Sequence, residues 1–197
     1  IIPKHMLPNY GVFDEKRVYN SGEMLKPIPF KSLKLGVMIC EDMWFPQSAQ
    51  YLKAHGADIL IVLNGSPFDL TKHERRLSQA RERVRETSLP LIYSNMVGGQ
   101  DHLVFDGRSF VMDANQNILF EAPAFQEDLS FIEVGLSHRK IALTPLTPFK
   151  QNPVSEGELL YRSLVRGLKD YVEKNHFKGV LIGLSGGVDS ALAAAIA

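Results

Sequence analysis

Short apolar runs alternate with segments of helical spacing in the first half of the chain, and this alternation restricts its fold more than any other feature. The runs at 33–39 (LKLGVMI), 57–63 (ADILIVL) and 90–95 read as buried strands. Residues 46–55 and 71–87 lie between them and read as helices. A strand–helix–strand–helix–strand order predicts an α/β domain.

The segments around this unit are less regular. Residues 1–32 are rich in Pro, Gly and Asn and read as loop. Thr71 is a plausible N-cap for the second helix, with Glu74 at the capping-box position. Between residues 103 and 134 the pattern changes to short strands joined by Asp-Gly and Asn-rich turns, which predicts a meander.

The last third of the chain predicts the beginning of a second unit. Residues 135–153 contain Pro145, Pro148 and Pro153 and read as a linker or an extended arm. Ser155 then begins a helix, with Glu158 at the capping-box position. The apolar stripe of this helix is formed by Leu160, Leu164, Leu168 and Val172. A short strand at 179–182, the sequence SGGVDS and an Ala-rich helix follow, as at the opening of a parallel nucleotide-binding sheet.

Composition argues against several classes of function. The chain carries 22 Lys and Arg against 22 Asp and Glu, so its zero net charge gives no reason to expect nucleic acid or a membrane surface as partner. The arginines of 71–87 alternate with glutamates, which favours a solvated, salt-bridged face. No apolar run is long enough to span a bilayer. A single cysteine excludes an intrachain disulfide, argues against a cysteine-based zinc site and is typical of a reducing compartment, so we predict a cytoplasmic protein with no metal ligands of its own.

Cys40 is the first candidate for chemistry, because it lies where the apolar run 33–39 gives way to the residues Glu-Asp-Met-Trp. The end of a strand followed by a turn presents a side chain well. The alternative is a cysteine buried as a small hydrophobe, which is common for a free thiol and leaves it unreactive. Lys4, taken alone, reads as a solvated surface lysine.

The second candidate is the glycine-rich loop at 183–190. Small residues let a backbone approach phosphate closely, and the following helix offers free N–H groups and the positive end of its dipole. The loop lacks the Gly-Lys-Ser/Thr ending of a Walker A motif. The alternative is a tight strand-to-helix turn without a ligand.

Longer blocks of the sequence resemble a known family. PKHMLPNYGVFDE at 3–15 and GVMICEDMW at 36–44 are similar to the nitrilase superfamily, and within it to the glutaminase domains of NAD⁺ synthetases. NGSPFDLTKHERR and NMVGGQDHLVFDGRSF continue the resemblance, and YRSLVRGLKDYVEKNHFKGVLIGLSGG resembles NAD⁺ synthetases rather than GMP or asparagine synthetases. The chain departs from the family at His102, where an acidic residue is expected.

The resemblance implies a Glu–Lys–Cys triad, in which Cys40 is the nucleophile and Lys4 is the family lysine. Amide carbonyls are poor electrophiles, so a thiolate must attack and the developing oxyanion must be held. A nearby ammonium lowers the thiol pKa and neutralises that oxyanion. The triad glutamate is expected before Ile1, and Glu41 is not assigned its role.

The resemblance also implies binding residues for two substrates. For glutamine they are Tyr10, Ser66 and Lys72, which from the residues alone also read as a half-buried tyrosine, a turn serine and a solvated first helical turn. SGGVDS is similar to the loop of ATP pyrophosphatases, which split ATP between its α and β phosphates. The implied ATP-binding residues are Gly183, Leu184, Ser185, Gly186, Gly187, Val188, Asp189 and Ser190, and Asp189 is expected to help hold Mg²⁺ or position the loop.

The implied activity is that of a ligase that uses glutamine as nitrogen donor. ATP adenylates deamido-NAD⁺, and ammonia released from glutamine then displaces AMP to give NAD⁺, with pyrophosphate and glutamate as the other products. The implied partners are glutamine, deamido-NAD⁺ and ATP with Mg²⁺, in a homo-oligomer without nucleic acid or membrane. Two alternatives stay open: a stand-alone nitrilase-type carbon–nitrogen hydrolase (amidase), and a non-catalytic nucleotide-binding relative.

The implied fold class is α/β throughout. Residues 1–136 are expected to be part of a nitrilase-like αββα sandwich, 137–154 a linker, and 155–197 the start of a parallel-sheet nucleotide-binding domain. The chain opens without Met and stops inside a predicted helix, so we expect a fragment of a longer protein.

Overall fold

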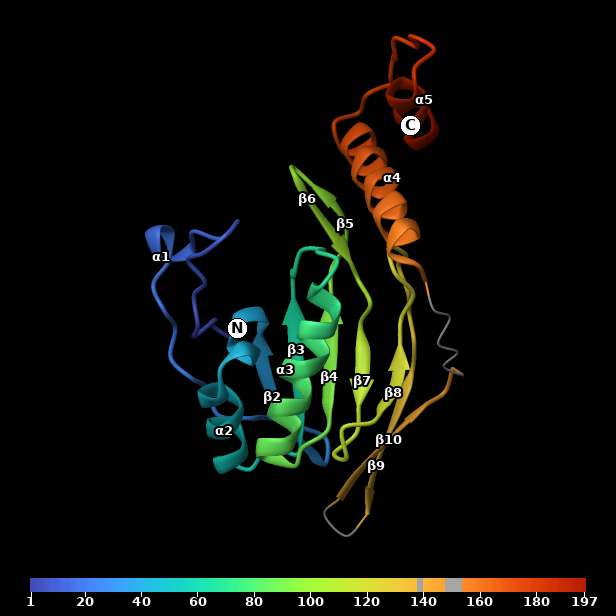
Figure 1. Cartoon of the computed structure of the whole chain (residues 1–197). Coiled ribbons are helices and arrows are strands. Elements are labelled where there is room, and N and C mark those ends of the chain that lie inside the picture. Colours follow the sequence, from blue (N-terminus) through green and yellow to red (C-terminus); the bar gives the residue numbers. More distant parts are fainter. Residues whose placement is uncertain (138–139, 148–153) are drawn as a thin grey trace.

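A six-stranded mixed sheet forms the centre of the molecule (Figure 1). The computed structural model describes residues 1–137, 140–147 and 154–197. The three central strands are parallel and the outer ones antiparallel. The strands, in spatial order, are β1 (Ile28–Phe30), β2 (Leu33–Ile39), β3 (Ile59–Asn64), β4 (Leu91–Asn95), β7 (Phe110–Met112) and β8 (Ile118–Glu121). The strands predicted in the first half and the α/β class are confirmed.

Two helices cover one face of this sheet, α2 (Pro46–Ala54) and α3 (Lys72–Thr87), both as predicted. Their apolar sides pack on the sheet to form a core cluster that includes Leu52, Leu77, Ala80, Val84, Met38, Leu60 and Tyr93. Thr71 is the N-cap residue of α3 as predicted, but the predicted capping bond is absent, because the Thr71 hydroxyl donates 2.7 Å to Asp69 and caps no backbone N–H. Asp69 also accepts from the Thr71 N–H, so an Asx turn takes the place of the cap.

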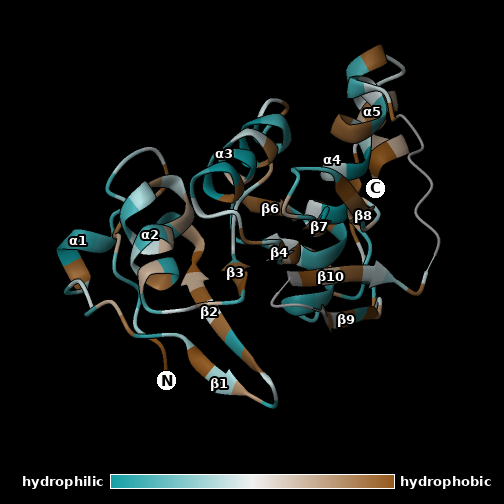
Figure 2. Ribbon diagram, turned by 90° about the horizontal axis from the view of Figure 1, so that it is seen from below, coloured by the Kyte–Doolittle hydropathy of each residue, from teal (hydrophilic) through white to brown (hydrophobic). Residues whose placement is uncertain are grey.

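A hairpin packs on the opposite face of the sheet (Figure 2). Its strands are β9 (Ile132–Ser137) and β10 (Lys140–Pro145), and Ile132 and Leu143 contact the sheet beside Phe120. The predicted linker 137–154 includes β10 (Lys140–Pro145), which fits the extended arm predicted as the alternative, while 138–139 and 148–153 lie outside the described residues. Pro145 is compatible with this strand because proline is tolerated at a strand end.

A second ribbon rises from the edge of the sheet and consists of β5 (Val97–Gln100) and β6 (Leu103–Asp106). β6 falls in the predicted meander, whereas β5 was not expected. Gly98 and Gly99 give β5 no side-chain alternation that could reveal a strand. The remaining short elements, α1 (Glu15–Val18) and β1, lie in the part predicted to be loop.

Helix α4 (Glu156–Lys174) and helix α5 (Val188–Ile196) form the last part of the chain. The Ser155 cap is confirmed, since its hydroxyl accepts from the Glu158 N–H at 3.2 Å. Leu160 and Leu164 of the predicted apolar stripe are exposed, and the helix buries Ser163 and Asp170 against β5 and β6 instead. The strand predicted at 179–182 is absent, because no described strand lies beside it to share hydrogen bonds. Over the described residues, no helix combines the length and apolarity of a membrane span.

Candidate active site

Cys40 stands at a sharp turn between β2 and the 3₁₀ helix η1 (Cys40–Trp44). Its φ of 48° lies in the left-handed region, which costs a side chain about 1–3 kcal/mol and is typical of functional sites. The Asp42 carboxylate holds the turn by accepting from the Ile39 N–H at 3.0 Å. It also accepts from the N–H groups of His5 and Met6, so it fixes the segment that carries Lys4 beside the thiol turn.

Lys4 and Cys40, the two predicted catalytic residues, line one cavity of about 460 Å³. Glu15 lines it as well, and its carboxylate pairs with the Lys4 ammonium at 2.6 Å. The sequence reading did not single out Glu15, although it lies in the same 3–15 block as the lysine. The structure thus places a thiol, a cation and an acid around one space, and their catalytic roles stay predictions.

Burial dominates the ionisation of the thiol. It raises the pKa of Cys40 above its usual value, and the nearby Lys4 charge acts in the opposite direction. Glu41 and Glu15 raise the thiol pKa further, whereas the Gly65 N–H favours the thiolate. The lysine contribution has the sign predicted from the sequence, but the net shift is upward. At neutral pH the thiol is therefore mostly protonated and needs a base to become nucleophilic.

Removal of the Lys4 charge should raise the pKa of the Cys40 thiol further and so slow its reaction with electrophiles. We expect Lys4→Met to move the pH profile of Cys40 alkylation by iodoacetamide to higher pH, because the contribution that lowers the thiol pKa is lost. Alkylation of the variant should be slower at every pH below the midpoint of the profile. Lys16→Met removes an exposed lysine nearby and is the matched control. An unchanged profile in Lys4→Met would show that the ammonium does not act on the thiol.

Two of the predicted glutamine-binding residues lie near Cys40. The Tyr10 hydroxyl donates a hydrogen bond of 2.9 Å to the carboxylate of Glu41, the neighbour of Cys40. Burial is the main cause that raises the pKa of Tyr10, and the hydrogen bond to Glu41 raises it further. The Lys72 ammonium lies 4.8 Å from the centre of the Trp44 ring, and burial lowers its pKa. Cys40 acts electrostatically on both groups. Glu41 and Trp44 belong to the motif block but were not predicted as site residues.

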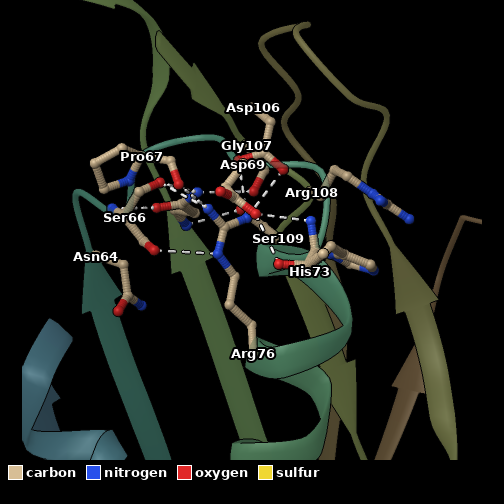
Figure 3. A network of polar contacts seen from close by, with 12 residues as sticks. Asn64, Ser66, Pro67, Asp69, His73, Arg76, Asp106, Gly107, Arg108 and Ser109 are labelled. Atoms are coloured by element: carbon tan, nitrogen blue, oxygen red, sulfur yellow. Dashed lines mark hydrogen bonds and ion pairs between the residues drawn. The ribbon is translucent and has the colours of Figure 1, made fainter. Parts of the chain in front are cut away.

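Ser66, the third predicted contact, is 3% exposed and belongs to a buried polar network (Figure 3). Arg76 makes five hydrogen bonds within it, which equals the number of donors on a guanidinium. Nε donates to the Ser66 hydroxyl, Nη2 to the carbonyls of Ser66 and Pro67, and Nη1 to both oxygens of Asp106. Because Gly65 lines the cavity, this network fixes one of its walls. Glutamine contacts by Tyr10, Ser66 and Lys72 stay predictions.

The glycine-rich loop lies far from the thiol along the chain and is exposed. Gly186 has a φ of 85°, which favours glycine, and Gly187 is the N-cap residue of α5. The Ser190 hydroxyl donates 3.0 Å to the Gly187 carbonyl, so it closes the turn at the helix start. The predicted ATP contacts at 183–190 stay predictions. Among the described residues, no group of three carboxylate, imidazole or thiol side chains is placed to hold a metal.

Comparison with protein families agrees with this fold. Residues 2–140 match the carbon–nitrogen hydrolase family, and residues 160–197 match NAD synthase. The chain belongs to the carbon–nitrogen hydrolase family. It ends in a segment of the NAD synthase type, as the sequence reading predicted.

Named relatives share both segments in the same order. The glutamine-dependent NAD⁺ synthetases of Acinetobacter baylyi and Rhodobacter capsulatus are 39% and 42% identical to it over 98% of the chain. The chain spans only 35% of the length of either relative. A solved structure of a glutamine-dependent NAD⁺ synthetase from Acinetobacter baumannii, in complex with ADP, superposes on this chain with a TM-score of 0.88. The two are 40% identical, and the match covers 98% of this chain and 36% of the other. A carbon–nitrogen hydrolase from Helicobacter pylori matches 63% of this chain and 48% of its own at 29% identity, with a TM-score of 0.55.

Proposed function

We propose that Cys40 hydrolyses glutamine and that the ammonia is used to make NAD⁺. The thiolate adds to the side-chain amide carbon, the C–N bond breaks, and ammonia leaves with a γ-glutamyl thioester on sulfur. Water then cleaves the thioester to glutamate and frees the thiol. The Lys4 ammonium, held by Glu15 at 2.6 Å, would stabilise the oxyanion of each step. The proton acceptor would be the glutamate of the family's triad, a role that no residue of this chain is assigned.

The ammonia would react at a second site that includes the loop 183–190. There the carboxylate of deamido-NAD⁺ would attack the α-phosphate of ATP and release pyrophosphate, and ammonia would then displace AMP to form the amide of NAD⁺. The N–H groups of the α5 N-terminus suit phosphate oxygens. Mg²⁺ is expected with ATP, and Asp189 lies in the first turn of α5, next to this phosphate site. The protein would then be a glutamine-hydrolysing NAD⁺ synthase.

The observation that carries this proposal is the cavity that Cys40, Lys4 and Glu15 share, in a chain whose end matches NAD synthase. The named relatives support the pairing of the two activities, because they are glutamine-dependent NAD⁺ synthetases that match 98% of this chain. The domain division at 136 and 155, cytoplasmic location and homo-oligomeric state are part of the same proposal.

Nitrogen-donor dependence tests the proposal in the full-length protein. Glutamine and ammonium should each support NAD⁺ formation from deamido-NAD⁺ and ATP. Acid quenching during glutamine turnover should yield a γ-glutamyl adduct on the peptide that contains Cys40, detected by mass spectrometry. Glutamine hydrolysis without ATP–pyrophosphate exchange would favour the amidase, which the match to the H. pylori hydrolase keeps open. ATP binding without an adduct would favour a non-catalytic nucleotide-binding protein.

The loop has its own test in Asp189. We expect Asp189→Ala to impair NAD⁺ formation with ammonia and with glutamine alike, because both routes need the adenylated intermediate. The expected loss is about 1–2 kcal/mol of transition-state binding, which lowers the rate of NAD⁺ formation roughly tenfold. Ser155→Ala, which removes a helix cap outside the loop, is the control. Normal ammonia-dependent turnover in Asp189→Ala would count against ATP binding at this loop.

A further inference from the structure

Helix α4 binds both backbone polar groups of one residue, Gly99, in the β5–β6 ribbon, which is part of the carbon–nitrogen hydrolase segment. Arg166, Asp170 and Lys174 recur every fourth residue and so share a face of α4. The Asp170 carboxylate accepts from the Gly99 N–H at 2.6 Å, and the Lys174 ammonium donates to the Gly99 carbonyl at 2.5 Å. Arg166 Nε donates to the same carboxylate oxygen at 2.9 Å. Asp170 is 5% exposed, so an acid is buried at this contact.

The close approach of helix and ribbon requires glycine on both sides. A Cβ at Gly98 would lie 2.7 Å from an Asp170 oxygen, and Gly98 has a φ of 127°. A Cβ at Gly99 would lie 3.0 Å from the Gly167 Cα, and one at Gly167 would lie 3.0 Å from a Val104 methyl group. Figure 1 shows α4 running along the ribbon. The contact is therefore closely packed on both sides.

The ribbon leads from this contact to the wall of the thiol cavity. Asn95 precedes β5, and its side chain accepts from the Ser66 N–H at 2.9 Å and donates to the Ser66 carbonyl at 3.2 Å. Asp106 ends β6 and binds Arg76, which donates to the same Ser66 carbonyl at 2.8 Å. Both ends of the ribbon therefore hold the Ser66 backbone, next to the Gly65 that lines the cavity beside Cys40.

We infer that Asp170 is a positioning residue for glutamine binding at the Cys40 cavity. It fixes Gly99, the ribbon carries this constraint to Asn95 and Asp106, and these two hold the Ser66 backbone at the cavity wall. The helix that leads to the glycine-rich loop would thereby shape the amide-hydrolysing site. This inference rests on the proposed function, because it takes glutamine as the ligand of the cavity.

Kinetics of the full-length protein test the inference from both sides of the contact. Asp170→Ala removes the acceptor, and Gly99→Ala pushes the ribbon away from Gly167. Each variant should raise the glutamine KM about tenfold, which is the effect of losing one hydrogen bond to a buried charged group. Turnover at saturating glutamine and ammonia-driven NAD⁺ formation should stay near the parental values, because neither depends on how tightly the cavity wall holds glutamine. Glu173→Gln, an exposed acid of the same helix, should change none of them.

Hydrogen exchange supplies a readout that does not depend on glutamine. The Ser66 N–H should exchange about tenfold faster in Asp170→Ala and Gly99→Ala, whereas amides of β2 should be unaffected. Asp170→Asn keeps an acceptor for Gly99 and should restore most of the protection and of the parental KM.

The outcomes separate the inference from the proposed function. Unchanged glutamine KM and unchanged Ser66 exchange in both variants would overturn the inference, even if the parental protein forms the thioester. Equal losses of turnover with glutamine and with ammonia would also overturn it, because they indicate a general structural role. If the Ser66 N–H exchanges faster in the variants but the parental protein forms no thioester, the connection through the ribbon is supported and glutamine is not the ligand of the cavity.

Discussion

Cys40→Ala should abolish glutamine-driven NAD⁺ formation while ammonia-driven formation continues. Alanine has no nucleophile, so no thioester can form, and loss of a nucleophile commonly costs roughly 10⁴-fold or more in turnover. The ammonia route does not use the thiol, because its chemistry takes place at the adenylated carboxylate. The measurement is the initial rate of NAD⁺ formation with saturating glutamine and, separately, with ammonium salt at a pH that provides free ammonia.

The control must separate the sulfur from the fold of the turn. Alanine keeps the β-carbon at a residue whose φ is 48°, so the strained backbone meets the same side-chain bulk next to it. Ammonia-driven activity in the same sample reports on folding of the protein. Glutamine-driven NAD⁺ formation that persists in Cys40→Ala would show that another group attacks the amide and that the assignment of the nucleophile is wrong.

Asp106→Ala should destabilise the region around the cavity more than any other single change in the network. Arg76 is fully buried and pairs with both oxygens of Asp106 at 2.8 and 2.9 Å. Removal of one partner of a buried ion pair leaves an uncompensated charge, which costs about 3–5 kcal/mol. Amides of α3 and β3 should then exchange with solvent roughly 100-fold faster or more, measured by native-state hydrogen exchange.

An exposed ion pair on the same helix is the matched control. Glu82 pairs with Arg85 at 2.5 Å in solvent, and such pairs contribute little to stability. Glu82→Ala should therefore leave the exchange of α3 and β3 unchanged. Equal, small effects in the two variants would mean that the buried Arg76 charge finds other partners or water when Asp106 is absent.

Sequence patterns predicted the elements that depend on interactions between residues close together in the chain. The runs around β2, β3 and β4 are apolar because strands between two packed layers need apolar side chains on both faces. Ser155 and Glu158 predicted the start of α4, because a capping bond joins residues three apart. The block around Cys40 predicted the turn that follows β2, since the motif and the turn are contained in a few consecutive residues.

Contacts between distant residues decided the rest. Lys4 and Glu15 could not be assigned to one cavity with Cys40 from their spacing, because Asp42 joins the two segments across 36 and 37 residues. Thr71 makes no capping bond because its hydroxyl donates to Asp69, and 179–182 forms no strand because a strand needs a neighbour. The sequence by itself determined the strand and helix order of residues 33–95, the turn at Cys40 and the start of α4. Only the tertiary structure decided that a buried arginine holds the Ser66 wall and that Asp170 grips Gly99, because hydrogen bonds across 10 and 71 residues leave no local pattern.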